Sequence, residues 1–246
     1  MALISYEQGN ISCYEDYSNF FKKETEYLLK FLTENNIICT FFAQGETAKR
    51  HPELLKLIKR RGHLVGSHGL KHVPRQTLSD KEFLADCIDS KNLIEDIIQD
   101  KVIGYRSPLL SISRSGYFNS LNILKEACYE YDSSIPEHNF RKLMLNNLIY
   151  EKEKLPIKIF PLTSFKSPLG EFNLAGGSTW RIFPSFITYM VLKSKLTTNN
   201  TSFYLHPYEF GAKIDPYRVI SKKSNKLKVL LKSLRWNINK KAIEKI

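Results

Sequence analysis

The sequence has few cysteines and no long apolar run. Its four cysteines stand singly without a C-x-x-C pair, and Cys39 lies inside an apolar segment, so we expect small buried hydrophobic side chains in a reducing compartment. No apolar stretch approaches the length that spans a bilayer, and the first residues lack the basic start and apolar core of a signal peptide. We therefore expect a cytoplasmic protein.

Acidic residues are scarce as well, with 25 against 37 basic residues and a net charge of +12. The excess is concentrated near the C-terminus, where Glu244 is accompanied by Lys222, Lys223, Lys226, Lys228, Lys232, Arg235, Lys240, Lys241 and Lys245. The same segment carries leucines at helical spacing, namely Leu227, Leu230, Leu231 and Leu234. Two interpretations stay open: a last helix packed on the domain, or an amphipathic helix resting on anionic lipid at the inner membrane. Nucleic acid is not an expected partner, because no recognition motif accompanies the basic residues.

The 246 residues can form one domain of the α/β-barrel size range. Internal repeats, low-complexity tracts and a clear domain linker are missing from the sequence. We therefore predict one domain over residues 1–212, followed by a basic amphipathic extension over residues 213–246.

Strand-like and helix-like segments alternate along the chain, which predicts a parallel α/β fold with crossover helices. The expected strands are Ala2–Tyr6, Ile37–Ala43, Leu64–Ser67, Val102–Tyr105, Tyr129–Asp132, Ile157–Phe160 and Thr201–Leu205. The expected helices are Ser18–Asn35, Glu46–Arg61, Asp80–Gln99 after a capping box of Ser79 and Glu82, Tyr117–Cys128 and Phe183–Lys195.

Two histidines in the run Ser67-His68-Gly69-Leu70-Lys71-His72 directly follow an expected strand. Residues four apart on one helical turn project to the same side, and neutral imidazole nitrogen is a good zinc ligand. A catalytic ion also needs a third protein ligand, usually a carboxylate, and an open position for water. Since an isolated pair of this kind is more often two surface or capping histidines, the rest of the chain must decide.

Other chemically capable side chains also follow expected strands, and chemistry in a parallel α/β barrel collects at the carboxyl ends of its strands. These candidates are Glu7, His68, His72, Arg106, Asp132 and His206. Each has a plain explanation alone: a surface cation for Arg106, a cap for Asp132, a buried imidazole for His206. Their shared position predicts a common site.

Several short motifs resemble those of a known family in order and spacing. They are Thr40-Phe41-Phe42 with Gly45, Arg61 to His68 with His72, Gly104-Tyr105-Arg106-Ser107-Pro108, Tyr131-Asp132-Ser133-Ser134 and Leu205-His206-Pro207-Tyr208-Glu209. With these motifs, residues 2–210 resemble the polysaccharide deacetylases of the NodB-homology group, carbohydrate esterase family 4. Gly176-Gly177 with Arg181 and Pro184 resembles a branch that acts on surface-polysaccharide sugars.

The resemblance implies a distorted (β/α) barrel of about seven parallel strands, here with a basic C-terminal helix. It also implies metal-dependent hydrolysis of an N-acyl group, normally N-acetyl, on an amino sugar of a surface polysaccharide or glycan precursor, which can be lipid-linked. His68 and His72 would bind a divalent cation, with Zn²⁺ as the expected ion. His206 would be the general acid, Asp132 would orient it, and Arg106 would hold the base.

The first motif, Ser5-Tyr6-Glu7-Gln8-Gly9, departs from the family pattern of two acids that are adjacent or one residue apart. With adjacent acids, Glu7 is the base and Gln8 replaces a ligand; with the wider spacing, Glu7 is the ligand and Ser5 replaces the base. We favour Glu7 as the ligand, and Glu15 or Asp16 could replace the base. Because one acid is missing either way, a catalytically impaired carbohydrate-binding protein and a sugar N-deformylase remain alternatives.

Overall fold

Short apolar runs form the strands of a parallel sheet in the computed structural model of this chain. The structure describes residues 14–113, 115–146, 155–167, 170–173, 175–177, 186, 189–190, 193 and 202–209. Contacts within the chain define two units. The first contains Met1–Leu3, Ile38–Ala175 and Asn200–Ser202, and the second contains Ile4–Ile37, Gly176–Asn199 and Phe203–Ile246.

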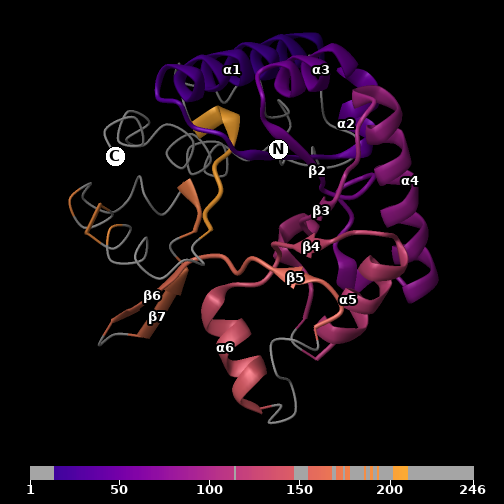
Figure 1. Cartoon of the computed structure of the whole chain (residues 1–246), viewed down its shortest axis with the longest axis vertical. Coiled ribbons are helices and arrows are strands. Elements are labelled where there is room, and N and C mark those ends of the chain that lie inside the picture. Colours follow the sequence, from indigo (N-terminus) through magenta and orange to yellow (C-terminus); the bar gives the residue numbers. More distant parts are fainter. Residues whose placement is uncertain are drawn as a thin grey trace, which may run out of the picture. The chain divides into compact units, whose positions relative to one another are not determined.

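Among the described residues, the sheet of the first unit has five strands, and each of the first four pairs in parallel with the strand that follows it in the chain. They are β1 (Thr40–Ala43), β2 (Leu64–Ser67), β3 (Gly104–Tyr105), β4 (Tyr131–Asp132) and β5 (Lys158–Ile159). Figure 1 shows the strands in chain order with helices α4 and α5 on their outer side. A sheet that advances one strand per crossover, with its helices outside, is the wall of a (β/α) barrel.

Glycines in the middle strands make room for aromatic rings from their neighbours. Phe42 pairs with Gly66 and Tyr131 pairs with Gly104 in the register of the sheet. A β-carbon on Gly66 would lie 2.7 Å from the Phe42 ring, and one on Gly104 would overlap the Tyr131 ring. Phe160 then meets Tyr131 edge-on, with ring centroids 5.3 Å apart. The rings cover strands that carry no side chain of their own at these positions.

The crossover helices of the first unit include α2 (Gly45–Arg50), α3 (Pro52–Arg60), α4 (Asp80–Ile98) and α5 (Tyr117–Glu126). The predicted single helix Glu46–Arg61 is wrong, since the chain leaves helical geometry at His51, with φ −130° and ψ 54°. Pro52 explains the break, because a proline disfavours helical geometry at the residue before it and is well accommodated in a helix's first turn.

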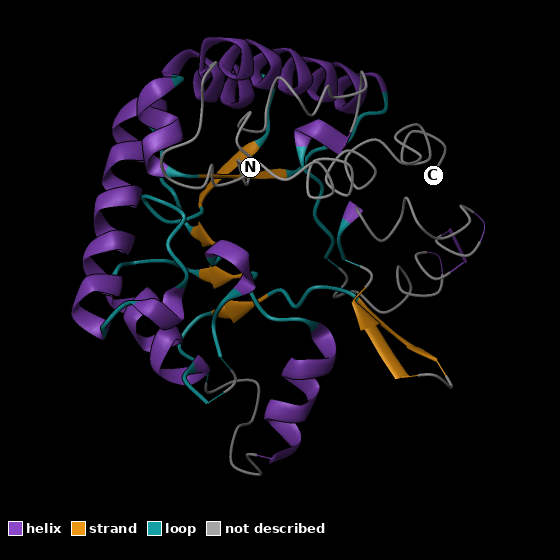
Figure 2. Ribbon diagram, turned by 180° about the vertical axis from the view of Figure 1, so that it is seen from behind, coloured by secondary structure: helices purple, strands orange, loops and turns teal. Residues whose placement is uncertain are grey.

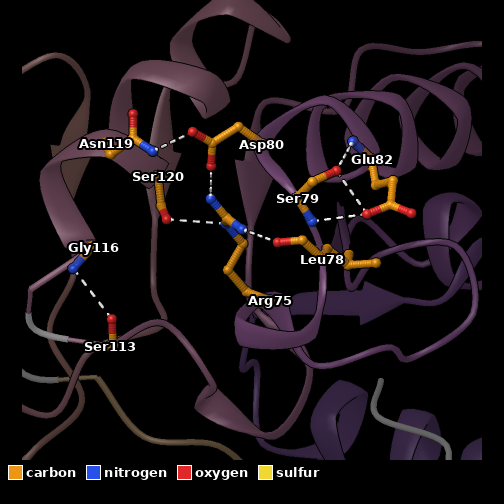
Figure 3. A network of polar contacts seen from close by, with 9 residues as sticks. All are labelled: Arg75, Leu78, Ser79, Asp80, Glu82, Ser113, Gly116, Asn119 and Ser120. Atoms are coloured by element: carbon orange, nitrogen blue, oxygen red, sulfur yellow. Dashed lines mark hydrogen bonds and ion pairs between the residues drawn. The ribbon is translucent and has the colours of Figure 1, made fainter.

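The predicted capping box at the start of α4 is confirmed: Glu82 N donates to Ser79 Oγ at 3.3 Å, and Ser79 N donates to Glu82 Oε2 at 2.8 Å. Arg75 lies beside it and donates to Leu78 O and Ser120 Oγ and pairs with Asp80. Asn119 on α5 donates to the second oxygen of Asp80 at 2.8 Å. Figure 3 shows how this network ties the start of α4 to α5.

One helix and two strands of the first unit were not predicted. Helix α6 (Glu137–Asn146) follows Pro136, and strands β6 (Ser164–Ser167) and β7 (Gly170–Asn173) form an antiparallel hairpin. Figure 2 shows this hairpin apart from the parallel sheet. Proline before α6 and the glycine at φ +125° in the hairpin are start and turn signals that the sequence contained.

The second unit contains α1 (Tyr14–Glu34), which confirms the helix predicted over Ser18–Asn35, and its residues Phe21, Leu28, Leu29 and Leu32 are buried. It contacts the short 3-10 helix η4 (Pro207–Glu209). The predicted strand Thr201–Leu205 is reduced to isolated bridges, from Ser202 to Leu162 and from Tyr204 to Gly176. Phe186, Tyr189, Met190 and Lys193, which are the described residues of the predicted helix Phe183–Lys195, are helical.

Several sequence predictions fall outside the described residues, namely the first strand, the extension 213–246 and Cys13. Of the described cysteines, Cys87 is buried as expected, whereas Cys128 is exposed in the turn after α5, at a positive φ of 59°. In the part of the chain that the structure describes, no helix combines the length and apolar character needed to cross a bilayer.

Candidate active site

His68 and His72 lie at the carboxyl end of β2, as their place in the sequence predicts. The amide of His68 donates to the carbonyl of Ala43 at 2.8 Å, which extends the pairing of β1 and β2 by one residue. The two rings have centroids 5.0 Å apart and an interplanar angle of 68°. Only 3% of His68 and 8% of His72 are exposed, so the surface interpretation of this pair is wrong.

The hydrogen bonding of His68 determines which of its nitrogens can bind an ion. Nδ1 lies 2.6 Å from the carbonyl oxygen of Arg106. Because a carbonyl oxygen only accepts hydrogen bonds, Nδ1 carries the proton and Nε2 keeps its lone pair. Histidines that bind metals typically donate their other ring N–H in this way.

Burial lowers the pKa of His68 well below its ordinary value, and the charge of nearby groups, including His72, acts in the same direction. The hydrogen bond to the Arg106 carbonyl opposes this shift but does not cancel it. His68 is therefore neutral at neutral pH, and neutral imidazole is the form that binds a metal ion.

His72 has a left-handed backbone, with φ 59°. This conformation is uncommon for a residue with a side chain, although histidine adopts it more often than most. Backbone strain of this kind costs about 1–3 kcal/mol and concentrates at functional sites, where the surrounding contacts impose it.

Arg106 follows β3, and its guanidinium contacts β1 and the residue after β4. Nε donates to Ser133 O at 2.8 Å, Nη2 donates to Ser133 Oγ at 2.7 Å, and the group stacks 4.4 Å above the Phe42 ring. The arginine thus joins the ends of β1, β3 and β4, while its own carbonyl holds His68. Its half-buried position excludes the interpretation as a plain surface cation.

Asp132 at the end of β4 is completely buried, with 0% exposure. It accepts hydrogen bonds from Tyr117 Oη at 2.7 Å, from Ser134 N at 3.0 Å and from Ser134 Oγ. Burial raises the pKa of this carboxyl group, whereas these hydrogen bonds lower it. Ser134 Oγ also accepts from Ser107 N at 2.8 Å, which links Asp132 to the segment after Arg106.

His206 belongs to the second unit and contacts a carboxylate that the sequence interpretation left without a role. Glu209, with 0% exposure, accepts from His206 N at 2.8 Å, and the same oxygen lies 3.4 Å from His206 Nδ1. The Tyr204 ring packs edge-on against the imidazole, with centroids 5.5 Å apart. The signal was present in the sequence: an acid three residues after the histidine, across a proline that starts one helical turn.

The predicted third metal ligand is not among the described residues. Glu7 lies outside them, together with Ser5 and Gln8, so its assignment stays a prediction. Within the described ranges no group of three or more His, Cys, Asp or Glu residues could hold an ion. The described part therefore supplies two imidazoles, and a metal site with three protein ligands would need a carboxylate from elsewhere in the chain. Asp132 and His206 belong to different units, and the prediction that one orients the other also stays open.

Comparison with known proteins identifies the family of this chain. A family model described as polysaccharide deacetylase matches residues 6–131. The chain is 30% identical over 108 residues to a peptidoglycan-N-acetylglucosamine deacetylase of Bacillus cereus, an alignment that covers 43% of this chain and 47% of the relative. It is 30% identical over 102 residues to a peptidoglycan-N-acetylmuramic acid deacetylase of Bacillus subtilis, covering 42% and 36%.

Among solved structures, a protein from Mycobacterium smegmatis that is assigned to the polysaccharide deacetylases superposes with a TM-score of 0.53 and 17% identity, covering 89% of this chain and 72% of that one. This similarity concerns the fold. The chain spans about half the length, or less, of these two curated relatives.

Because the family model matches half of the chain, this protein belongs to the polysaccharide deacetylase family. The predicted membership of the NodB-homology group, carbohydrate esterase family 4, is confirmed. So is the mixed α/β fold with a parallel sheet in a distorted barrel, to which the described residues contribute five parallel strands.

Proposed function

We propose that this protein removes the N-acetyl group from an amino sugar of a polysaccharide or glycan precursor, with a divalent cation bound by His68, His72 and Glu7. The observation that carries the proposal is the buried pair of histidines, in which His68 directs its N–H to the Arg106 carbonyl and keeps Nε2 for a ligand. Membership of the polysaccharide deacetylase family supports the reaction class.

The donor set fits Zn²⁺. Two imidazoles and one carboxylate are an established ligand set of catalytic zinc, and His68 is held in the neutral form that such an ion requires. When bound, such an ion polarises the amide carbonyl and makes its bound water more acidic. Both imidazoles are buried, and electrostatic interactions between buried groups are stronger than in bulk water.

The remaining residues would position the substrate amide and move protons. Arg106 is fixed by Ser133 and Phe42, so it can hold a carboxylate base without reorganising. His206 would protonate the leaving amine. Glu209 accepts a hydrogen bond from the backbone amide of His206 and lies on the Nδ1 side of the ring. By the family resemblance Asp132 orients His206, and in the first unit it also holds the segment after Arg106 through Ser134.

The test is acetate release from N-acetylglucosamine oligomers, from peptidoglycan and from lipid-linked N-acetylamino sugars, measured with metal-free protein and after addition of Zn²⁺. We expect release that a chelator abolishes and Zn²⁺ restores. His68→Ala should bind no stoichiometric Zn²⁺, whereas His138→Ala, on α6, should bind it normally. Wild-type protein that cannot be loaded with a divalent cation would overturn the proposal.

A second candidate is a carbohydrate-binding descendant without turnover, and the sequence favours it at one point: Glu7 is the sole acid of the first motif, between Ser5 and Gln8. Ser5→Asp and Gln8→Asp each restore an acid at one of the two family spacings. A large gain of activity from either change would show that the catalytic site is intact and that the missing acid limits turnover in the wild-type protein. Binding of the glycan with no turnover in wild type or in both variants supports the second candidate.

The site of action is part of the proposal. We place the protein in the cytoplasm, with its basic extension on anionic lipid near a lipid-linked substrate. Chain deleted after Lys222 should partition less onto phosphatidylglycerol vesicles than the full chain does, and the difference should shrink at high salt. Equal partition of the two chains would rule out the membrane contact, and a last helix packed on the domain would then be the remaining interpretation of the extension.

A further inference from the structure

The three residues between the histidines are held by hydrogen bonds from three directions. Gly45 N and Glu46 N, in the first turn of α2, donate to the carbonyls of Gly69 and Leu70, each at 3.0 Å. The amide of Gly69 donates to Ser67 Oγ at 3.2 Å. A turn whose backbone groups are bonded in this way has little freedom to change the spacing of the residues on either side of it.

The remaining direction is supplied by one carboxylate on α4. Asp86 accepts from Leu70 N with both oxygens, Oδ1 at 3.2 Å and Oδ2 at 3.1 Å, and also interacts with the amide of Lys71. Asp86 is half-buried and lies on a helix that contacts α2, α3 and α5. The carboxylate therefore belongs to a part of the first unit that is well anchored.

Gly69 allows the turn to lie this close to Asp86. Its φ of +74° favours glycine, and a β-carbon there would lie 2.9 Å from Asp86 Oδ2 and 3.3 Å from Pro108 Cγ. The turn can approach the carboxylate only because this position has no side chain. Gly69 and Asp86 thus act together to hold the turn, although they lie 17 positions apart in the chain.

We infer that Asp86 is a positioning residue for the metal ligands, which holds the backbone between His68 and His72 so that both imidazoles face one cation. This inference rests on the proposed function. Charge-assisted hydrogen bonds are roughly twice as strong as neutral ones, and a carboxylate can accept from two amides at once. An amide side chain offers a single accepting oxygen, so Asn retains part of the interaction and Ala retains none of it.

The experiment compares Asp86→Ala and Asp86→Asn with a matched control, Asp89→Asn, which removes an exposed carboxylate from the same helix. Zn²⁺ affinity of the full chain is measured by competition with a chromophoric chelator, and Co²⁺ absorption spectra report ligand geometry. We expect Zn²⁺ to bind about 10–100-fold more weakly to Asp86→Ala, with a smaller loss for Asp86→Asn and none for the control. Saturating Zn²⁺ should restore much of the turnover that Asp86→Ala loses.

A second readout does not need the metal. In metal-free protein, the imidazole ¹⁵N resonances of His68 and His72 should shift in Asp86→Asn and stay in place in Asp89→Asn. Wild-type affinity and spectra in both Asp86 variants would overturn the inference. Where Asp86→Ala does not fold, as circular dichroism would show, Asp86→Asn decides. Failure of wild-type protein to bind any divalent cation is a different result, which would overturn the proposed function. The imidazole ¹⁵N resonances would then still test whether Asp86 positions the two histidines.

Discussion

The Nδ1 atom of His68 lies 2.6 Å from the carbonyl oxygen of Arg106. This hydrogen bond joins two motifs from neighbouring strands. Arg106 therefore has two separate roles, one for its backbone and one for its side chain. Its carbonyl sets the tautomer of the histidine, whereas its guanidinium is fixed on Ser133 and Phe42. Since the first role belongs to the backbone, a side-chain substitution at position 106 should leave it in place.

Arg106→Ala therefore separates metal binding from turnover. We expect Zn²⁺ affinity close to that of wild type, because the carbonyl that orients His68 remains. Turnover should fall by up to about 10²–10⁴-fold, the usual contribution of a positioned proton transfer, because the base, for which Glu15 and Asp16 are the candidates, loses its partner. Calorimetric titration with Zn²⁺ and acetate release measure the two effects, and a parallel loss of both would contradict the division of roles.

Glu209→Gln tests the carboxylate beside His206. The amide can still accept from His206 N, but it removes the negative charge 3.4 Å from Nδ1. If Glu209 supports the general acid, kcat should fall markedly while KM changes little. Asp132→Asn is the comparison, because that carboxylate was the sequence-based choice for the same task. A loss of kcat in Asp132→Asn alone, at unchanged stability, would return the role to Asp132.

Gly104→Ala should destabilise the sheet. The new methyl group would overlap the Tyr131 ring, which lies directly above this position. Overpacking of a well-packed core costs about 1–3 kcal/mol, visible as a lower midpoint in urea denaturation. Gly116→Ala is a milder control, with 3.2 Å to Ser113 Oγ. Gly104→Ala should lower the midpoint less in the Tyr131→Ala background than in wild type, and strict additivity of the two changes would argue against the overlap.

His63 should make the protein less stable in acid. Only 2% of it is exposed, neither ring nitrogen has a hydrogen-bond partner among the described residues, and it packs on the Phe41 ring. Burial, with a smaller contribution from Arg61, lowers the pKa of His63 below 6.5. The His63 of the unfolded chain then binds a proton more readily than that of the folded chain. The free energy of unfolding is therefore undiminished at pH values above the unfolded pKa of His63, and it declines as the pH falls below that value.

His63→Phe removes that titration and keeps the apolar contact. The free energy of unfolding of metal-free protein should fall less between about pH 7.5 and about pH 5.5 in the variant than in wild type. Because His68 titrates in the same direction in both proteins, the difference between them isolates His63. Equal pH dependence would show that His63 finds a partner when protonated.

Much of the fold was readable from local sequence. The apolar runs predicted strands β1 to β5 to within a few residues, and Ser79 with Glu82 predicted the start of α4, because periodicity and capping depend on neighbouring residues. Pro52, which disfavours helical geometry at His51, is the sequence signal that separates α2 from α3. The motifs placed His68, His72, Arg106 and Asp132 at strand ends, since parallel strands deliver their carboxyl ends to one edge.

The contacts that orient these side chains depended on the tertiary structure. Three hydrogen bonds form only after strands and helices distant in sequence have packed. They join Asp86 to the turn between His68 and His72, Ser134 to Ser107, and the Arg106 carbonyl to His68. Hydrogen bonds between such segments leave no periodic trace, because they depend on distances in space and not on spacing along the chain. Residue types and their order thus determined the family and its reaction class, whereas packing decided which nitrogen of His68 is free to bind an ion.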